Sequence, residues 1–164
     1  MTELQYKNML CWIKSRPKLA KLTVLSGKVV TYCIYAFYPL FIIFLIFTQN
    51  SAGYKCVLVP AVSFLILSMV RYLLNFPRPY EKYDLVPLYN KSTVGRSFPS
   101  RHTFCIFIIA VTAFYIYPAI GITIAILGVI LAVSRVLCGV HFIRDVVAGA
   151  LSGLVMGTVG FYLF

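Results

Sequence analysis

The stretch TFCIFIIAVTAFYIYPAIGITIAILGVILAVS, at residues 103–134, contains no charged residue. As one straight helix it would be about 48 Å long, whereas the hydrocarbon core of a bilayer is about 30 Å thick. Near its middle, residues 117–121 read YPAIG, and proline and glycine are the residues that most often interrupt a helix. The stretch therefore predicts two membrane-spanning helices joined by a tight turn at Pro118.

Three further apolar runs of bilayer-spanning length flank this stretch, at residues 29–47, 56–74 and 146–164. The chain of 164 residues is 61% hydrophobic, with a mean hydropathy of +0.90. We predict an all-α integral membrane bundle of about five transmembrane helices, forming one domain over residues 1–164 with its bundle at residues 29–164. In the last run glycine recurs every fourth residue, which predicts a smooth strip for close helix packing, at Gly149, Gly153 and Gly157.

The first 28 residues differ from the apolar runs because cations are interleaved with apolar side chains such as Trp12 and Leu19. Pro17 interrupts any single long helix over this segment. Basic amphipathic segments of this kind lie on the membrane surface instead of crossing it. We therefore predict an interfacial helix within residues 1–28, and a multi-pass protein of the cell membrane. The cations of this segment are Lys7, Lys14, Arg16, Lys18, Lys21 and Lys28.

The charge balance is strongly basic, with 15 Lys and Arg against four Asp and Glu, and a net charge of +11. In a soluble protein this balance would indicate nucleic-acid binding. Here the basic residues adjoin membrane-spanning runs, so anionic headgroups and a phosphorylated substrate are the expected partners, with no nucleic acid. The five cysteines are scattered and contain no CxxC pair, which indicates reduced thiols.

Polar residues that carry chemistry gather in two connections, at residues 75–101 and 135–145. With five spans these connections lie on the same face of the membrane, near the headgroup layer. An arginine at the end of a membrane helix commonly extends to the interface, but this does not explain histidine, serine and aspartate beside it. The residues that converge are Arg71, Arg78, Ser100, Arg101, His102, Arg135, His141 and Asp145.

The spacing of His141 and Asp145 is i, i+4, so on a helix they share one face and the carboxylate can orient the imidazole. An oriented neutral imidazole is a competent nucleophile or base. Arg71, Arg78 and Arg135 supply guanidinium groups, which bind tetrahedral oxyanions through paired hydrogen bonds. The residues therefore predict a phosphate site with a histidine nucleophile or base. Two histidines and a carboxylate also match a metal triad, against which the surrounding arginines argue by repelling a cation.

Three motifs now stand in order at the ends of apolar helices: RYLLNFPRP at residues 71–79, PSRH at 99–102 and SRVLCGVHFIRD at 134–145. They resemble the signature of the type 2 phosphatidic acid phosphatases, which share their active-site design with vanadium haloperoxidases. That family has lysine where this chain has Arg71. It has glycine where this chain has Arg101, a bulky cation that either narrows the site or adds a headgroup contact. The family usually has six spans and its site on the outer face, whereas five spans are predicted here.

The resemblance implies a metal-independent lipid phosphatase without a cofactor, in which His141 attacks phosphorus and forms a phosphohistidine. Asp145 would orient His141, and His102 would protonate the leaving oxygen. Because the family has lysine at position 71, Arg71→Lys is predicted to be tolerated better than Arg71→Ala. The residues implied to hold the phosphate oxygens are Arg71, Arg78, Ser100, Arg101 and Arg135.

The substrate stays open between several lipids with a terminal phosphate, namely phosphatidylglycerophosphate, phosphatidate and a polyprenyl diphosphate. An undecaprenyl-diphosphate phosphatase acting on the outer face is the alternative enzyme. A vanadate-dependent haloperoxidase and a non-enzymatic membrane protein such as a transporter or scaffold are the other two alternatives. Cytoplasmic connections are enriched in Lys and Arg, and this rule places the site on the cytoplasmic face, against the habit of the family.

Overall fold

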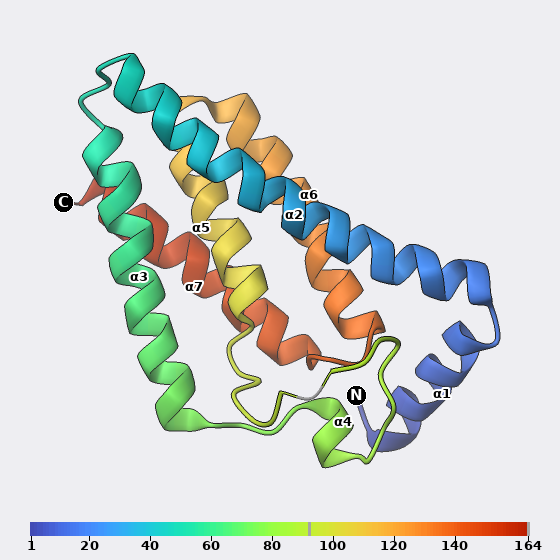
Figure 1. Cartoon of the computed structure of the whole chain (residues 1–164). Coiled ribbons are helices and arrows are strands. Elements are labelled where there is room, and N and C mark those ends of the chain that lie inside the picture. Colours follow the sequence, from blue (N-terminus) through green and yellow to red (C-terminus); the bar gives the residue numbers. More distant parts are fainter. Residues whose placement is uncertain (92, 164) are drawn as a thin grey trace.

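The computed structural model describes residues 1–91 and 93–163, and in this part of the chain every regular element is a helix. Four helices are long and apolar enough to cross a membrane: α2, α3, α6 and α7 (Figure 1). The predicted helical membrane bundle is therefore confirmed. The elements are α1 (Glu3–Lys14), α2 (Pro17–Phe47), α3 (Gly53–Leu74), α4 (Pro79–Lys82), α5 (Arg101–Ile116), α6 (Pro118–Leu137) and α7 (Ile143–Tyr162).

The short apolar helix α5 forms the centre of the bundle and packs against α2, α3, α6 and α7. Its side chains are buried almost without interruption from Thr103 to Ala113. Its packing against α7 is close, as the glycine strip predicted. A Cβ on Gly149 would lie 2.5 Å from the carbonyl oxygen of Ser100, and one on Gly153 would lie 2.7 Å from that of Phe104. Only glycine permits this approach of two helix backbones.

The predicted turn at Pro118 is confirmed, because α5 ends at Ile116 and Pro118 opens α6. Tyr117 between them is extended, with φ −136° and ψ 94°. Proline has no backbone N–H to donate into a preceding turn, and its fixed φ suits the first position of a helix. The uncharged stretch therefore folds into two antiparallel helices instead of one long one.

The N-terminal segment differs from the expected boundary at residue 28. Helix α2 begins at Pro17 and runs for 31 residues without a break. Pro39 lies inside this helix without ending it, so the apolar run at residues 29–47 is the second part of α2 and not a separate element. At about 1.5 Å per residue, α2 exceeds the thickness of the hydrocarbon core, and its first turns carry Lys18, Lys21 and Lys28.

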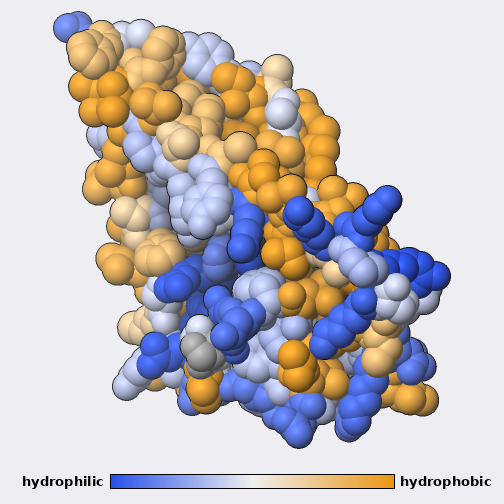
Figure 2. Space-filling view, turned by 45° about the vertical axis from the view of Figure 1, so that its right-hand side comes forward, coloured by the Kyte–Doolittle hydropathy of each residue, from blue (hydrophilic) through white to orange (hydrophobic). Residues whose placement is uncertain are grey.

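A separate helix, α1, precedes it and is capped by Thr2 and Gln5, whose side chains each accept a hydrogen bond from the backbone N–H of the other. It folds back beside α4 and the polar end of the bundle (Figure 1). Figure 2 shows hydrophilic residues gathered at this lower end and hydrophobic residues over the upper part. The two polar connections, at residues 75–101 and 135–145, therefore share one end of the molecule with α1 and the first turns of α2.

Candidate active site

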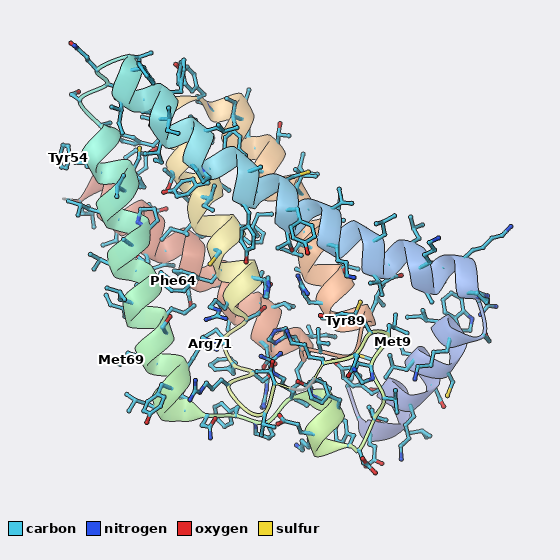
Figure 3. All side chains as sticks on the ribbon, viewed as in Figure 1. Met9, Tyr54, Phe64, Met69, Arg71 and Tyr89 are labelled. Carbon is cyan, nitrogen blue, oxygen red and sulfur yellow. The ribbon has the colours of Figure 1, made fainter. Side chains whose placement is uncertain are left out.

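A small cavity of about 60 Å³ lies where α3, α5, α6 and the connection after α4 meet. In Figure 3, Arg71 lies on the α3 side of this region and Tyr89 on the α6 side. The cavity contains six of the eight side chains that the sequence brought together, and we call it the cradle. Its lining residues are Arg71, Arg78, Tyr89, Lys91, Thr93, Arg101, His102, Arg135, Val140 and His141.

His141 reaches the cradle from a turn and not from a helix, which corrects the helical-face argument. Helix α6 ends at Leu137, and Gly139 adopts φ +75°, a left-handed conformation that suits glycine. Helix α7 begins at Ile143 with Asp145 in its first turn. The turn nevertheless brings the pair together, with 3.5 Å between Nδ1 of His141 and Oδ2 of Asp145. The predicted partnership therefore holds for a different geometric reason.

Asp145 is fully buried, and its carboxylate is held by two donors besides His141. The hydroxyl of Ser97 donates to Oδ2 at 2.5 Å, and the backbone N–H of Phe142 donates to the same oxygen at 3.0 Å. Ser97 also lies 3.4 Å from Nδ1 of His141. Sequence reasoning missed Ser97, although it stands in SFPSRH, three residues before Ser100. Its role depends on the fold, which places the loop against α7.

The imidazole of His141 is only 3% exposed. Burial lowers its pKa to about 4, and the positive charges of Arg78 and Arg71 act in the same direction while Asp145 opposes them. The imidazole of His141 is therefore neutral at physiological pH. Because its folded-state pKa lies below the ordinary value of 6.5, the unfolded chain binds the proton first as pH falls. Through this residue, the free energy of unfolding decreases progressively as the pH falls from 6.5 to about 4.

A histidine titration checks this pKa directly. The chain has two histidines, so His102→Gln leaves His141 as the single imidazole. We expect the ¹⁵N resonances of His141 in detergent micelles to stay those of a neutral ring from pH 8 to pH 5.5, because burial disfavours the cation. A midpoint near 6.5 would contradict the buried, arginine-surrounded position of this ring.

Arg71 is 6% exposed and directs its guanidinium into the backbone of the connection between α4 and α5, which we call the α4–α5 loop. Its two terminal nitrogens donate to the carbonyl oxygens of Arg96, Ser97 and Pro99. The fork thus fixes the segment that carries Ser97 as well as lining the cradle. A lysine, which is a point charge with rotatable donors, cannot reproduce this planar arrangement.

Arg71→Lys therefore has an expected cost even though the related family has lysine at this position. We expect a loss of about 1–3 kcal/mol in unfolding free energy, because buried carbonyl groups lose their donors. Activity should fall less than in Arg71→Ala, since lysine keeps the charge. Thermal unfolding in detergent and phosphate release measure the two effects, with the exposed Arg16→Lys as the control. A lysine variant as stable as the wild type would show that the hydrogen bonds from Arg71 to the loop carbonyls do not contribute to the free energy of unfolding.

Arg78 and Arg135 complete the basic wall. Arg78 is 6% exposed and donates from Nε to the carbonyl oxygen of Gly95 at 3.1 Å. Arg135 donates from its terminal nitrogens to the hydroxyls of Tyr89 and Thr31, each at 3.0 Å. Its buried Nε has no hydrogen-bond partner among the described residues. Both guanidinium groups are therefore fixed by protein oxygens while they face the cradle.

Of the other two predicted phosphate ligands, Arg101 lines the cradle and Ser100 does not. Arg101 is exposed and lines the cradle, with its guanidinium 5.9 Å from the ring centre of Phe64. Ser100 is fully buried and is not part of the cavity wall. Its hydroxyl accepts from Thr103 at 3.1 Å, and its backbone N–H donates to the carbonyl oxygen of Asp145 at 2.8 Å. Ser100 thus joins α5 to α7 behind the cradle.

A contact from the N-terminal helix was not foreseen at all. The hydroxyl of Tyr6 is fully buried and donates to the carbonyl oxygen of His141 at 2.9 Å. The ring of Tyr6 packs against those of Tyr83 and Phe142, with centroids 6.1 and 5.7 Å away. No local pattern near residue 6 signals a partner 135 residues further along the chain. Helix α1 therefore braces the turn that carries His141.

Fixed guanidinium groups around a neutral, oriented imidazole suit a phosphoryl group, and their position at the polar end of a membrane bundle suits a lipid. These features are those of a phosphate-binding site at the polar end of a membrane bundle. Sequence comparison supplies the family: the chain matches the PAP2 superfamily over residues 52–164, more than half of its length. The protein belongs to this family.

Individual relatives agree with this assignment. The chain is 26% identical over 119 residues to the bacitracin transport permease protein BcrC of Bacillus licheniformis, an alignment that covers 70% of this chain and 59% of that protein. The fold is similar to the crystal structure of Aquifex aeolicus LpxE, with a TM-score of 0.73 and 24% identity over 94% of this chain and 92% of that one.

A second solved structure with this fold is the PAP2-type phosphatidylglycerolphosphate phosphatase of Bacillus subtilis. The TM-score is 0.71 and the identity 22%, over 96% of this chain and 81% of that one. At these identities the two structural likenesses concern the fold. They show that the helical fold matches these two structures over nearly the whole chain.

Proposed function

We propose that the protein removes the terminal phosphate of a membrane lipid without a metal, through a phosphohistidine on His141. The observation that carries this proposal is the His141–Asp145 pair beside the cradle. Nδ1 of His141 faces the carboxylate at 3.5 Å, which leaves Nε2 for a phosphorus atom held in the cradle. The candidate substrates are phospholipids of the phosphatidylglycerophosphate or phosphatidate type and polyprenyl phosphates or diphosphates.

In the first step Nε2 of His141 attacks phosphorus in line with the ester oxygen. The N–P bond forms as the P–O bond breaks, and His102 gives a proton to the departing oxygen, which belongs to an alkoxide in a phosphate ester and to a phosphate in a diphosphate. Arg71, Arg78 and Arg135 hold the nonbridging oxygens while charge redistributes over them. Asp145 stabilises the positive charge that develops on the imidazole. The products of this step are the phosphohistidine and the dephosphorylated lipid.

In the second step water replaces the lipid. His102, which is now neutral, takes a proton from the water as its oxygen attacks phosphorus. The N–P bond breaks, His141 recovers its neutral ring, and orthophosphate leaves the cradle. The same guanidinium groups hold the transferred phosphoryl group in both steps, so one small cavity serves the whole cycle.

Phosphate release from the purified, detergent-solubilised protein tests this proposal. The assay uses mixed micelles of each candidate lipid in the presence of a chelator. We expect orthophosphate release from at least one lipid at an undiminished rate after chelation. Release that requires an added divalent ion, or none from any lipid, would overturn the proposal. Bromination of an organic acceptor with vanadate and peroxide would instead favour the haloperoxidase alternative.

We propose further that the site faces the cytoplasm. The cations of α1 and of the first turns of α2 lie at the same end as the cradle: Tyr6 contacts His141, and Lys14 donates to the carbonyl oxygen of Val86 at 2.7 Å. At the opposite end, the connection between α2 and α3 is followed by Lys55. Cytoplasmic ends of membrane helices are enriched in such cations, and this asymmetry supports the proposal.

Cysteine labelling checks the sidedness. Single cysteines replace Lys91 and Lys55 in a cysteine-free background, and an impermeant maleimide is applied to intact cells. We expect labelling at position 55 and none at position 91 until the cells are permeabilised. Labelling at position 91 but not at position 55 would reverse the assignment and place the site on the outer face.

A further inference from the structure

A second cavity, of about 240 Å³, adjoins the cradle between α2, α6 and the α4–α5 loop. Four residues line both cavities: Tyr89, Lys91, His102 and Arg135. We call this second cavity the vestibule. Its other lining residues are Val24, Gly27, Lys28, Thr31, Tyr32, Tyr35, Ser134 and Cys138.

The position of His102 shows which part of a substrate the vestibule receives. His102 lines both cavities and is the proposed acid for the leaving oxygen, whereas His141 lines the cradle alone. The scissile P–O bond therefore crosses the junction between the two cavities. Everything attached beyond the leaving oxygen lies in the vestibule or past it.

The vestibule is basic and carries no carboxylate among its lining residues. Three cationic side chains line it: Lys28 from α2, Lys91 from the α4–α5 loop and Arg135 from α6. In the part of the chain that the structure describes, no acidic side chain forms an ion pair with any of the three. Three unpaired cations around one cavity attract an anion, and hydroxyl groups of Tyr32, Tyr35 and Tyr89 are available beside them.

Two observations at the junction agree with an anion there. Burial and the neighbouring charges of Arg78, Arg135 and Arg101 lower the pKa of Lys91, so its charge lacks a counterion in this position. The buried Nε of Arg135 has no acceptor among the described residues, while its other two nitrogens are bound. A phosphate at this junction would supply the counterion that Lys91 lacks.

Tyr35 lines the vestibule and also a wide apolar groove of about 670 Å³ between α2, α3 and α5. The order outward from His141 is therefore a phosphate cradle, a second basic cavity and an apolar groove. Phosphatidate does not match this order, because its glycerol and acyl chains directly follow the scissile phosphate. A lipid with a second phosphate between the scissile one and the hydrocarbon matches each step.

We propose that the vestibule binds a second phosphate carried by the leaving group, so that the enzyme selects doubly phosphorylated lipids over phosphatidate. This inference rests on the proposed function. Two lipid classes carry the required chemistry: a polyprenyl diphosphate, whose second phosphate directly follows the first, and phosphatidylglycerophosphate, whose second phosphate follows a glycerol. Lys28 and Lys91 are the specificity-determining residues for either class.

The test compares kcat/KM for a polyprenyl diphosphate, phosphatidylglycerophosphate and phosphatidate in mixed micelles of fixed charge. Wild type is compared with Lys28→Gln and Lys91→Gln. The matched control is Lys21→Gln, because Lys21 is exposed on the same helix two turns before Lys28 and does not line the vestibule. We expect each vestibule variant to lower the preference for the doubly phosphorylated lipid over phosphatidate by about tenfold or more, the size of a lost charge-assisted hydrogen bond.

The outcomes separate this inference from the proposed function. A uniform loss on all three lipids, or none beyond that of Lys21→Gln, would overturn the vestibule while leaving the phosphatase intact. A higher kcat/KM of the wild type for phosphatidate than for both doubly phosphorylated lipids would also overturn the vestibule and leave the proposed phosphatase activity intact. No phosphate release from any lipid would instead count against the proposed function. The lipid class whose rate falls most in the variants identifies the source of the second phosphate.

A binding measurement on the wild type keeps the inference testable if a variant does not fold. Methylenediphosphonate carries two linked phosphonate groups that no hydrolysis separates, and methylphosphonate carries one. We expect the former to inhibit at least about tenfold more tightly, since its second group occupies the vestibule. Equal inhibition by the two compounds would refute a second phosphate site next to the cradle.

Discussion

His141→Ala is expected to lower kcat by at least about 10⁴-fold, because removing a covalent nucleophile leaves the bound phosphate without an attacking group. The fold should survive, since His141 lies in a turn and not within a helix. The backbone contact with Tyr6 uses the carbonyl oxygen of residue 141, which alanine retains. Phosphate release and thermal unfolding in detergent measure the two quantities separately.

A trapping experiment gives this prediction its control. Rapid acid-free denaturation after mixing with ³²P-labelled lipid should leave acid-labile, alkali-stable label on the wild type and none on His141→Ala. Asp145→Asn should take up label only slowly, because an amide does not stabilise the positive charge on the ring and can hold the imidazole in the wrong tautomer. Labelling of the alanine variant, or a rate within about a hundredfold of wild type, would transfer the nucleophile's role to another residue.

His102→Ala is expected to lower the rate on lipid substrates by about 10²–10⁴-fold, the usual contribution of a general acid. The loss should depend on the leaving group. A lipid alkoxide requires protonation as it departs, whereas an activated nitrophenolate departs with little help. The first turnover of an aryl phosphate should therefore be spared in part. Its second step should still be slow, since the same histidine activates the water.

Stopped-flow measurement of nitrophenolate resolves these two steps. We expect a burst that approaches one equivalent per enzyme in His102→Ala, followed by slow turnover as the phosphohistidine accumulates. Equal losses on lipid and aryl substrates, without a burst, would show that His102 only binds phosphate. His102→Gln is the control for the lost volume, because glutamine fills a similar space but cannot transfer a proton to the leaving oxygen.

Most of the bundle was predictable because its signal is local. Runs of apolar residues long enough to cross a bilayer, and Pro118 between two of them, predict helices and a turn without knowledge of any distant contact. The N-terminal boundary was wrong for a related reason. Cations at Lys18, Lys21 and Lys28 mark where a helix leaves the hydrocarbon, and this is not where the helix ends, because helical hydrogen bonds continue in water.

The candidate site was predictable as a set of residues and not as a geometry. Counting spans places both polar connections at one end, and the three motifs name its histidines and arginines. The same count gives no information on which side chains face the cavity. Ser100 was expected among the phosphate ligands, yet the close approach of α7 at Gly149 places it behind the cradle. The pairing of His141 with Asp145 was right, but a turn and not a helical face produces it.

By itself, the sequence determined a helical membrane bundle, the end at which its chemistry gathers and the residue types that bind phosphate, because hydrophobic periodicity and motif spacing act along the chain. Only the tertiary structure decided three hydrogen bonds. Ser97 donates to Asp145, Tyr6 donates to the carbonyl oxygen of His141, and the guanidinium of Arg71 donates to carbonyl oxygens of the α4–α5 loop. These contacts join residues 48, 135 and 26 positions apart. No local pattern encodes such pairs, since they form only once packing of the helices has brought their ends together.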